Sequence, residues 1–189
     1  RRYDSMEAGE VPSIKALVVL DGDGKRIAAR YYKQDFVGLA AESAFEKKLF
    51  EKTSRTNARS EAEIIMFDNM VSVYRNSSDV WMYVVGNPTE NELVLVNVLT
   101  ALHETLNAAL RATPDKRNLL DNFETLLLII DELIDGGMIL EMDASAIVNR
   151  VGMKGSDGGT TGSETTFTEQ SFNTILASAR EQIARSLLK

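Results

Sequence analysis

The sequence of 189 residues predicts an α+β protein in which helices flank a five-stranded antiparallel sheet, with an amphipathic helix at the C-terminal end. Three observations predict this class. Five short strand-like runs are joined by turns of hairpin length. Two longer segments with helical spacing follow them. A stretch rich in Gly, Ser and Thr then precedes a last helical pattern, so we expect a core domain at 13–151, a flexible linker at 152–166 and a C-terminal helix at 167–189.

The composition limits the classes of function. Cysteine is absent, which removes disulfides, thiolate metal sites and a cysteine nucleophile. The net charge of −7 disfavours a general nucleic-acid binder, which needs clustered cations. The uninterrupted apolar run at residues 126–130 is far shorter than the ~20 residues that cross a bilayer. Because no secretory leader pattern is visible either, we expect a soluble cytosolic protein, and we leave residues 1–5 outside the fold argument.

Residues 13–32 form the first predicted hairpin, with its turn at LDGDGK. Asp-Gly pairs supply the positive φ values that tight hairpin turns require. The Asp-x-Asp-Gly run that starts at Asp21 is also similar to the start of a calcium-binding loop. The twelfth position counted from Asp21 is Tyr32, however, where such a loop needs a glutamate, so a hairpin is favoured over a calcium site.

The next predicted element is a helix over residues 39–52. Phe45 and Leu49 recur at helical spacing, and Ser43 with Glu46 has the spacing of an internal capping box. Three strands are predicted after a polar loop. They cover 64–67, 70–75 and 80–86, with turns at Asp68-Asn69 and at the NSSD run. The last strand, VWMYVV, is apolar on both alternating faces, which predicts a strand covered on both sides.

A long helix is predicted over residues 93–111, with Thr89 and Glu92 at capping-box spacing. One polar arc contains its polar side chains: Asn97, Thr100, His103, Glu104, Asn107 and Arg111. The rest of the helix surface is apolar or alanine. This apolar surface is wider than the stripe that a single sheet face would cover. We therefore predict that a partner protein contacts its apolar face around Val94, Val98 and Ala101.

A second long helix is predicted over residues 118–135, and the Gly136-Gly137 pair that follows is typical of a helix end. Its predicted core face holds Leu119, Phe123, Leu126, Leu127, Ile130, Leu133 and Ile134. The opposite face is acidic and has Leu128 in its middle. This face gives a second candidate interface, formed by Leu128, Asp131 and Glu132.

Acids at a helix C-terminus interact unfavourably with the helix dipole, so the acidic face needs an explanation. Three interpretations stay open: a solvated acidic face, an acidic face turned toward a cationic partner, and a metal site. A metal enzyme would use Asp131, Asp135 or Glu141. No histidine or cysteine lies nearby to complete a ligand shell, so we expect no metal and no cofactor.

Catalytic patterns are scarce in this sequence. His103 is the only histidine, and it lies at the border of the polar arc. No nucleophile elbow, phosphate-binding loop, dinucleotide fingerprint or HExxH motif is found. We therefore expect a protein that is not an enzyme. Its surplus of apolar surface is typical of an obligate subunit, whose interface is like a domain core cut in half.

The order of elements resembles the longin-like small subunits of vesicle coats and clathrin adaptors. The segments that carry this resemblance are SIKALVVLDGDGKRIAARYY, FEKKLFEKTSRT, SDVWMYVVGNPTENELVLVNVL and LLLIIDELIDGGMILEMD. The tail SAREQIARSLLK extends past the point where the sigma chains of clathrin adaptors end. The closer resemblance is thus to the coatomer branch, with a sigma chain as the alternative.

The resemblance implies a non-catalytic subunit without a cofactor. It implies direct pairing with the N-terminal trunk of the coatomer gamma subunit, in an adaptor-like core that an Arf-family GTPase recruits to Golgi membranes. The implied role is retrograde Golgi-to-ER and intra-Golgi transport. Cargo and GTPase contacts would lie largely on other coatomer subunits, so the implied membrane association is peripheral, on the cytosolic face of the Golgi and of coated vesicles.

Overall fold

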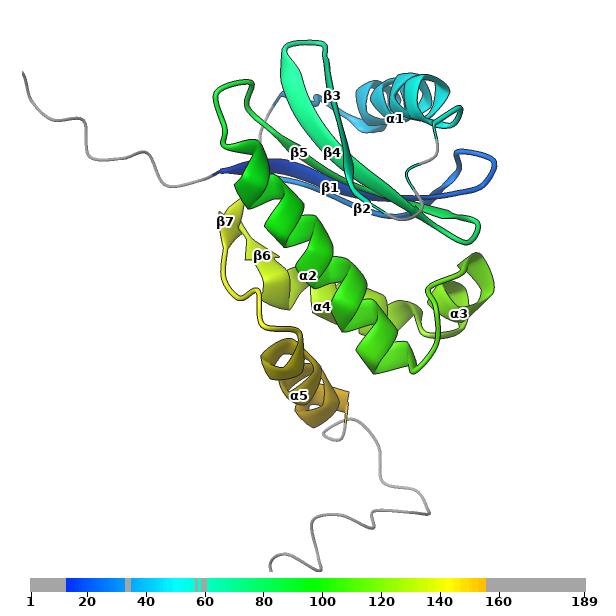
Figure 1. The fold of residues 1–189 in the computed structure, drawn as a ribbon, viewed down its shortest axis with the longest axis vertical. Helices are drawn as coiled ribbons and strands as arrows, with labels where there is room; N and C mark the ends of the chain where they lie inside the picture. The colour runs from blue at the N-terminus through cyan, green and yellow to red at the C-terminus, as the bar shows by residue number, and fades with distance from the viewer. Residues whose placement is uncertain (1–12, 33–34, 57, 59–60, 156–189) are drawn as a thin grey trace, which may run out of the picture. The chain divides into compact units, whose positions relative to one another are not determined.

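The computed structural model describes residues 13–32, 35–56, 58 and 61–155, and Figure 1 shows their arrangement. Most of the predicted linker and the predicted C-terminal helix at 167–189 lie outside the described residues. The main sheet has five antiparallel strands in the order β2-β1-β5-β4-β3, which confirms the predicted class. Its strands are β1 Ile14–Asp21, β2 Arg26–Tyr31, β3 Glu63–Phe67, β4 Met70–Ser77 and β5 Val80–Gly86.

Polar residues with unusual backbone angles make the hairpin turns. At the β1–β2 turn, Asp21 Oδ1 accepts hydrogen bonds from the backbone N–H groups of Asp23 (2.9 Å) and Lys25 (2.8 Å), as an Asx-type turn requires. Asp68 and Asn69 have φ values of 49° and 55° between β3 and β4. The predicted NSSD turn is shorter than expected, because β4 continues to Ser77.

Helix α1, Leu39–Thr53, covers one face of the sheet (Figure 1). It packs there over a cluster that is rich in aromatic side chains. The helix begins after Gly38, whose φ is 84°, and no side chain caps it. The predicted capping box at Ser43 is therefore wrong. Its second member, Glu46, is buried and binds Arg26 Nη2 at 2.7 Å and the Tyr31 hydroxyl at 2.8 Å.

Helix α2, Glu92–Leu110, packs on β4 and β5 on the other face of the sheet. Its N-cap is Asn91, whose Oδ1 accepts a hydrogen bond from Leu93 N at 3.0 Å, so the predicted cap at Thr89 is wrong. The helix is long and apolar enough to cross a membrane by length and composition alone. Most of its apolar residues instead form part of the main hydrophobic core, because α4 and α5 also pack against the helix.

The predicted second helix is broken in two. Helix α3, Lys116–Asp121, and helix α4, Phe123–Leu133, meet at Asn122, whose backbone angles (φ −120°, ψ 39°) are not helical. Asp115 caps α3, since its Oδ1 accepts a hydrogen bond from Asn118 N at 2.7 Å. The break turns Phe123 away from the predicted core face, so this side chain is 39% exposed.

The Gly136-Gly137 pair forms a hairpin turn and not the predicted helix end. Strands β6, Ile134–Asp135, and β7, Met138–Ile139, pair across it, and the glycines have φ values of 56° and 87°. A Cβ on Gly137 would lie 2.7 Å from the Ile14 carbonyl oxygen, so only glycine fits this close approach. Asp135 consequently leaves the helix, and Asp131 and Asp135 do not share a helical face.

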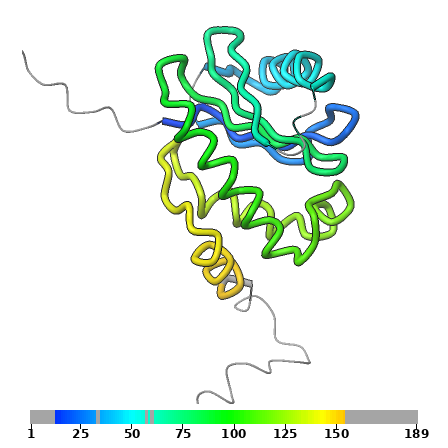
Figure 2. Tube along the Cα trace, viewed as in Figure 1, coloured from blue at the N-terminus to red at the C-terminus, as the bar shows by residue number. Residues whose placement is uncertain are grey.

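Helix α5, Ala144–Gly155, was not predicted. Asp143 precedes it and accepts hydrogen bonds at Oδ1 from Ser145 N (2.8 Å) and Ala146 N (3.1 Å), as a helix N-cap does. Ile147 and Val151 bury its inner side against α2 and α4. Figure 2 shows the chain passing from the β6–β7 hairpin into this helix, which continues beyond the predicted linker start at residue 152.

Candidate functional site

The predicted interface on α2 lies largely inside the protein. Val98 is fully buried and Ala101 is 3% exposed, and both belong to the main hydrophobic core; Val94 is half-buried. The surplus of apolar surface on this helix is real, but α4 and α5 of the same chain cover most of it and leave Leu93 exposed. The prediction that Val98 and Ala101 present a surface to a partner is thus corrected.

The predicted interface on α4 remains at the surface. Leu128 is half-buried at the margin of the main core. Asp131 is exposed and binds Arg30 of β2 through two contacts, Nε–Oδ1 at 3.1 Å and Nη2–Oδ2 at 3.4 Å. Glu132 binds Arg150 Nε of α5 at 3.2 Å. The charge that compensates these acids at the end of α4 therefore comes from the chain itself.

Two of the residues proposed for a metal site, Asp131 and Glu141, have other roles. Glu141 Oε1 accepts hydrogen bonds from Met142 N and Asp143 N, both at 3.0 Å, and Oε2 binds Arg150 Nη2 at 3.1 Å. These bonds, chiefly the backbone ones, hold the pKa of Glu141 below its ordinary value. Across the described ranges, no three acidic or histidine side chains group as metal ligands would.

Strand β3 presents apolar side chains that the sequence reasoning did not identify as surface. Ile64 is 51% exposed and Met66 is 60% exposed. They pair with Val73 and Val71 of β4 and so lie on the α2 side of the sheet. They stay exposed because β3 is the edge strand and α2 packs on β4 and β5.

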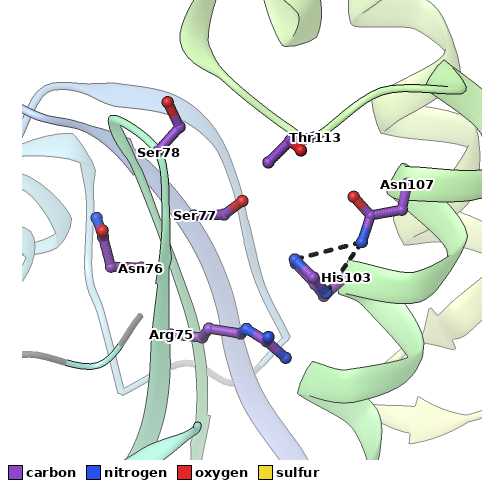
Figure 3. A pocket seen from close by; sticks show the side chains of 7 residues that line it. All are labelled: Arg75, Asn76, Ser77, Ser78, His103, Asn107 and Thr113. Atoms are coloured by element: carbon purple, nitrogen blue, oxygen red, sulfur yellow. Dashed lines mark hydrogen bonds between the residues drawn. The ribbon is translucent and has the colours of Figure 1, made fainter. Parts of the chain in front are cut away.

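A polar cleft of about 570 Å³ lies between β4 and α2, and we call it the β4–α2 cleft (Figure 3). Its lining residues are Arg75, Asn76, Ser77, Ser78, His103, Asn107 and Thr113. They come from the end of β4, from the C-terminal half of α2 and from the loop after α2. Figure 3 shows the Arg75 side chain reaching from β4 toward His103, while the Asn76 side chain points away from the cleft.

Hydrogen bonds fix two walls of the cleft. Asn107 Nδ2 lies 3.2 Å from Nδ1 and 3.3 Å from Nε2 of His103, one helical turn away. Ser77 Oγ donates to the Pro114 carbonyl oxygen at 3.2 Å and so anchors the loop after α2 to β4. Burial first, and then the positive charge of Arg75, lower the pKa of His103, so the imidazole is neutral at pH 7.

The sequence reasoning placed His103 at the edge of the polar arc but did not identify Arg75. The signal was present in the strand pattern. Arg75 has the same parity along β4 as Val71 and Val73, which are buried under α2. A cation at an inward-facing strand position indicates a polar opening in the layer above it.

Comparisons with known proteins point to one family. Residues 13–158 match the family model described as "Clathrin adaptor complex small chain". Human coatomer subunit zeta-2 is 46% identical over 177 residues, which cover 94% of this chain and 79% of that protein. Coatomer subunit zeta-3 of Oryza sativa subsp. japonica is 44% identical, covering 93% and 97% of the two chains. Coatomer subunit zeta-1 of Arabidopsis thaliana is 40% identical, covering 94% and 98%.

Among solved structures, a chain in a homology model of the full-length AP-3 complex is similar in fold. The TM-score is 0.59, and the match covers 76% of this chain and 94% of that chain. The sequence identity is 17%, so this likeness concerns the fold alone.

Proposed function

The chain belongs to the family of clathrin adaptor complex small chains and, within it, to the coatomer zeta subunits, and on this premise we propose that it pairs directly with the trunk of the coatomer gamma subunit. The resulting pair is one half of an adaptor-like core of the COPI coat. An Arf-family GTPase recruits this core to the cytosolic face of Golgi membranes. The chain acts there as a non-catalytic subunit in retrograde Golgi-to-ER and intra-Golgi transport.

The observation that carries this proposal is the identity of 40–46% to coatomer zeta subunits of human and plants over 93–94% of the chain. Similarity over this length covers the sheet, all five described helices and residues beyond them. The likeness to the AP-3 chain is far weaker in sequence, so it supports the shared fold and does not favour a clathrin-adaptor sigma chain.

We propose that the outer face of α4 contributes to the contact with gamma. Leu128 supplies a half-exposed apolar centre on this helix. Asp131 and Glu132 surround it, each held in place by an arginine of the same chain. An apolar centre with a polar, oriented rim is the usual composition of a stable interface. Val94 remains a second, separate candidate on α2, because Val98 and Ala101 are buried.

Co-expression tests the pairing. The full chain is produced together with the gamma trunk and, in parallel, with the equivalent trunk of a clathrin-adaptor large chain. We expect a complex with gamma that survives size-exclusion chromatography, and none with the clathrin-adaptor trunk. Failure to bind gamma would refute the proposal, and equal binding to both trunks would support the sigma alternative.

A further inference from the structure

Strand β3 forms one edge of the main sheet, and no other strand of the described chain pairs with its outer side. The turn that joins β3 to β4 consists of Asp68 and Asn69, which both have positive φ values. In such a two-residue turn the flanking residues, Phe67 and Met70, form a hydrogen-bonded pair. This pair determines which backbone groups of β3 are already used by β4.

The backbone groups of Ile64 and Met66 point away from β4. Hydrogen-bonded and non-hydrogen-bonded pairs alternate along an antiparallel ladder, so Ile65 bonds to β4 while its two neighbours face the free edge. The side chains of these neighbours are exposed as well, by 51% and 60%. Edge strands are commonly guarded by a bulge, a proline or a lysine, and the regular run EIIMF of β3 has none of these. The edge is therefore open to another strand.

We propose that β3 pairs in antiparallel orientation with β3 of a second copy of this chain, so that the two five-stranded sheets form one continuous sheet. When Ile65 lies opposite Ile65 of the second copy, all five residues of each strand are paired. Ile64 then lies opposite Met66 of the second copy, and the two residues exchange the backbone hydrogen bonds that each chain leaves free. The two-fold axis repeats this pair, so the apolar side chains of both copies meet on the α2 side of the joined sheet.

Opposite charges meet on the α1 side in the same register. Glu63 lies opposite Phe67 of the second copy. Within each chain Lys52 Nζ lies 5.7 Å from the centre of the Phe67 ring, and Glu63 Oε2 accepts a hydrogen bond from the Tyr74 hydroxyl at 2.7 Å. Both groups keep their charges in these contacts, so the carboxylate of one copy comes close to the ammonium group of the other.

A second copy fits this edge better than an unrelated strand. Any extended peptide can satisfy the free backbone groups, but β3 also has its apolar side chains and its opposite charges placed so that the strand complements itself. One short strand buries less than the ~800 Å² per partner of a standard interface, so we expect a weak and reversible dimer. This inference does not depend on the pairing with gamma, because the β3 residues are not those of the proposed α4 contact.

Analytical ultracentrifugation of the full chain at concentrations from about 5 to about 500 µM measures the association. We expect the weight-average mass to rise from that of one chain toward that of two. Amide hydrogen exchange, followed by NMR on the same samples, locates the contact. Exchange of the Ile64 and Met66 amides should slow at least about threefold as the concentration rises, whereas the Ile65 amide, already bonded to β4, should change little.

Two variants test the register. Ile64→Glu and Met66→Lys each place a charge beside an apolar side chain of the second copy, so each variant alone should stay monomeric. In an equimolar mixture the new carboxylate lies opposite the new ammonium group, and the other pair of positions stays apolar. We expect the mixture to dimerise at least about tenfold more tightly than either variant alone. Leu93→Glu, at an exposed apolar position of α2, is the matched control and should dimerise like the unmodified chain.

Three results would overturn the β3 dimer: a mass of one chain at every concentration, an equal loss of dimer in Ile64→Glu and Leu93→Glu, or a mixture that associates no better than its components. A monomeric chain whose Ile64→Glu variant no longer binds the gamma trunk would assign the edge to gamma instead. Amide spectra establish that each variant is folded. If a β3 variant does not fold, the amide exchange of the unmodified chain decides the question.

Discussion

Helices α2 and α4 are both strongly apolar, but they differ in how the rest of the chain covers them. The sheet, α4 and α5 all pack against α2, so most of its apolar side chains are buried, although Leu93 in its first turn is 71% exposed. Helix α4 buries one side in the main core but keeps Leu128 half-exposed on the other. Surplus apolar residues on one helix therefore do not measure the surface left for a partner, because other helices of the same chain can cover them.

The largest effect expected from this comparison is that of Val98→Asp in α2. Val98 has no exposed surface, so the new carboxylate is buried without a partner. We expect a loss of unfolding free energy of at least about 4 kcal/mol, enough to unfold a typical domain of this size. Circular dichroism and denaturant titration of the isolated chain measure it.

Val98→Ala is the milder companion, with an expected loss of about 2 kcal/mol from the missing methyl groups and the cavity they leave. The folded Val98→Ala chain should bind gamma as tightly as the unmodified chain. If Val98→Asp stayed folded and only lost gamma, α2 would be a true interface and the contrast with α4 would fail.

The next effect concerns α3, the other half of the broken helix. Lys116 Nζ of α3 binds Asp21 Oδ2 at 2.8 Å, and the Asp21 side chain is 4% exposed. Asp21→Asn removes this charged contact, and we expect a loss of about 2 kcal/mol in chemical denaturation at pH 7. Asn118→Ala in the same helix is a comparison that leaves the contact intact. Equal losses from both variants would contradict a specific role for the Asp21–Lys116 pair.

The same pair predicts the pH dependence. Burial alone would raise the pKa of Asp21, but the hydrogen bonds from Lys116 and from two backbone N–H groups outweigh it and hold the pKa below 3.8. The folded state thus holds the proton less tightly than the unfolded state. The stabilisation is complete above about pH 5 and is lost as the pH falls through the folded-state pKa. The stability difference between the unmodified chain and Asp21→Asn should shrink over that window.

A smaller effect on stability but a clear one on binding is expected for Leu128→Gln in α4. The half-exposed position tolerates a polar side chain, so unfolding free energy should fall by less than about 1.5 kcal/mol. Affinity for the gamma trunk should fall at least about tenfold, measured by calorimetry, if Leu128 is the apolar centre of the contact. Met66→Gln on strand β3 is the matched control. A normal affinity of Leu128→Gln would place the interface elsewhere.

The smallest effect is expected for Arg150→Gln, which tests how α5 is held to α4. Arg150 binds both Glu132 and Glu141, but its side chain is 45% exposed. Partly exposed ion pairs contribute about 0.5 kcal/mol, so the midpoint of denaturation should shift only slightly, and less at high salt. A loss like that of Val98→Ala would show that these ion pairs, and not apolar packing, fix α5.

The strands and their turns were predictable because their signals are local. Alternation of apolar residues and Asp-Gly or Asp-Asn turns determine pairing within a few residues, and the five strands lie where this pattern puts them. Element ends were less predictable. Thr89 and Asn91 are both good caps by residue type, and only the tertiary position of α2 selects Asn91.

The C-terminal part of the core shows why the rest could not be predicted. Gly136-Gly137 is compatible with a helix end and with a hairpin, and the close approach of Ile14, far away in sequence, decides for the hairpin. Among the α5 residues whose burial the structure describes, only Ile147 and Val151 are buried, and the helix contains Gly152 and Gly155, so its helical signal is weak. Because α5 was not predicted, the sequence reasoning did not indicate that another helix of the same chain packs on α2. Val98 and Ala101, which are buried, were therefore interpreted as an interface.

The late position of α5 in the chain has a consequence during synthesis. The ribosome makes the sheet and α2 first, and the segment that seals α2 leaves the exit tunnel only after residue 155 has been added. Until then the nascent chain exposes the apolar side of α2 that α5 later covers, and chaperones or neighbouring nascent chains can bind to it. Slowing translation just before residue 144 should therefore lengthen the interval in which this protein is prone to aggregate.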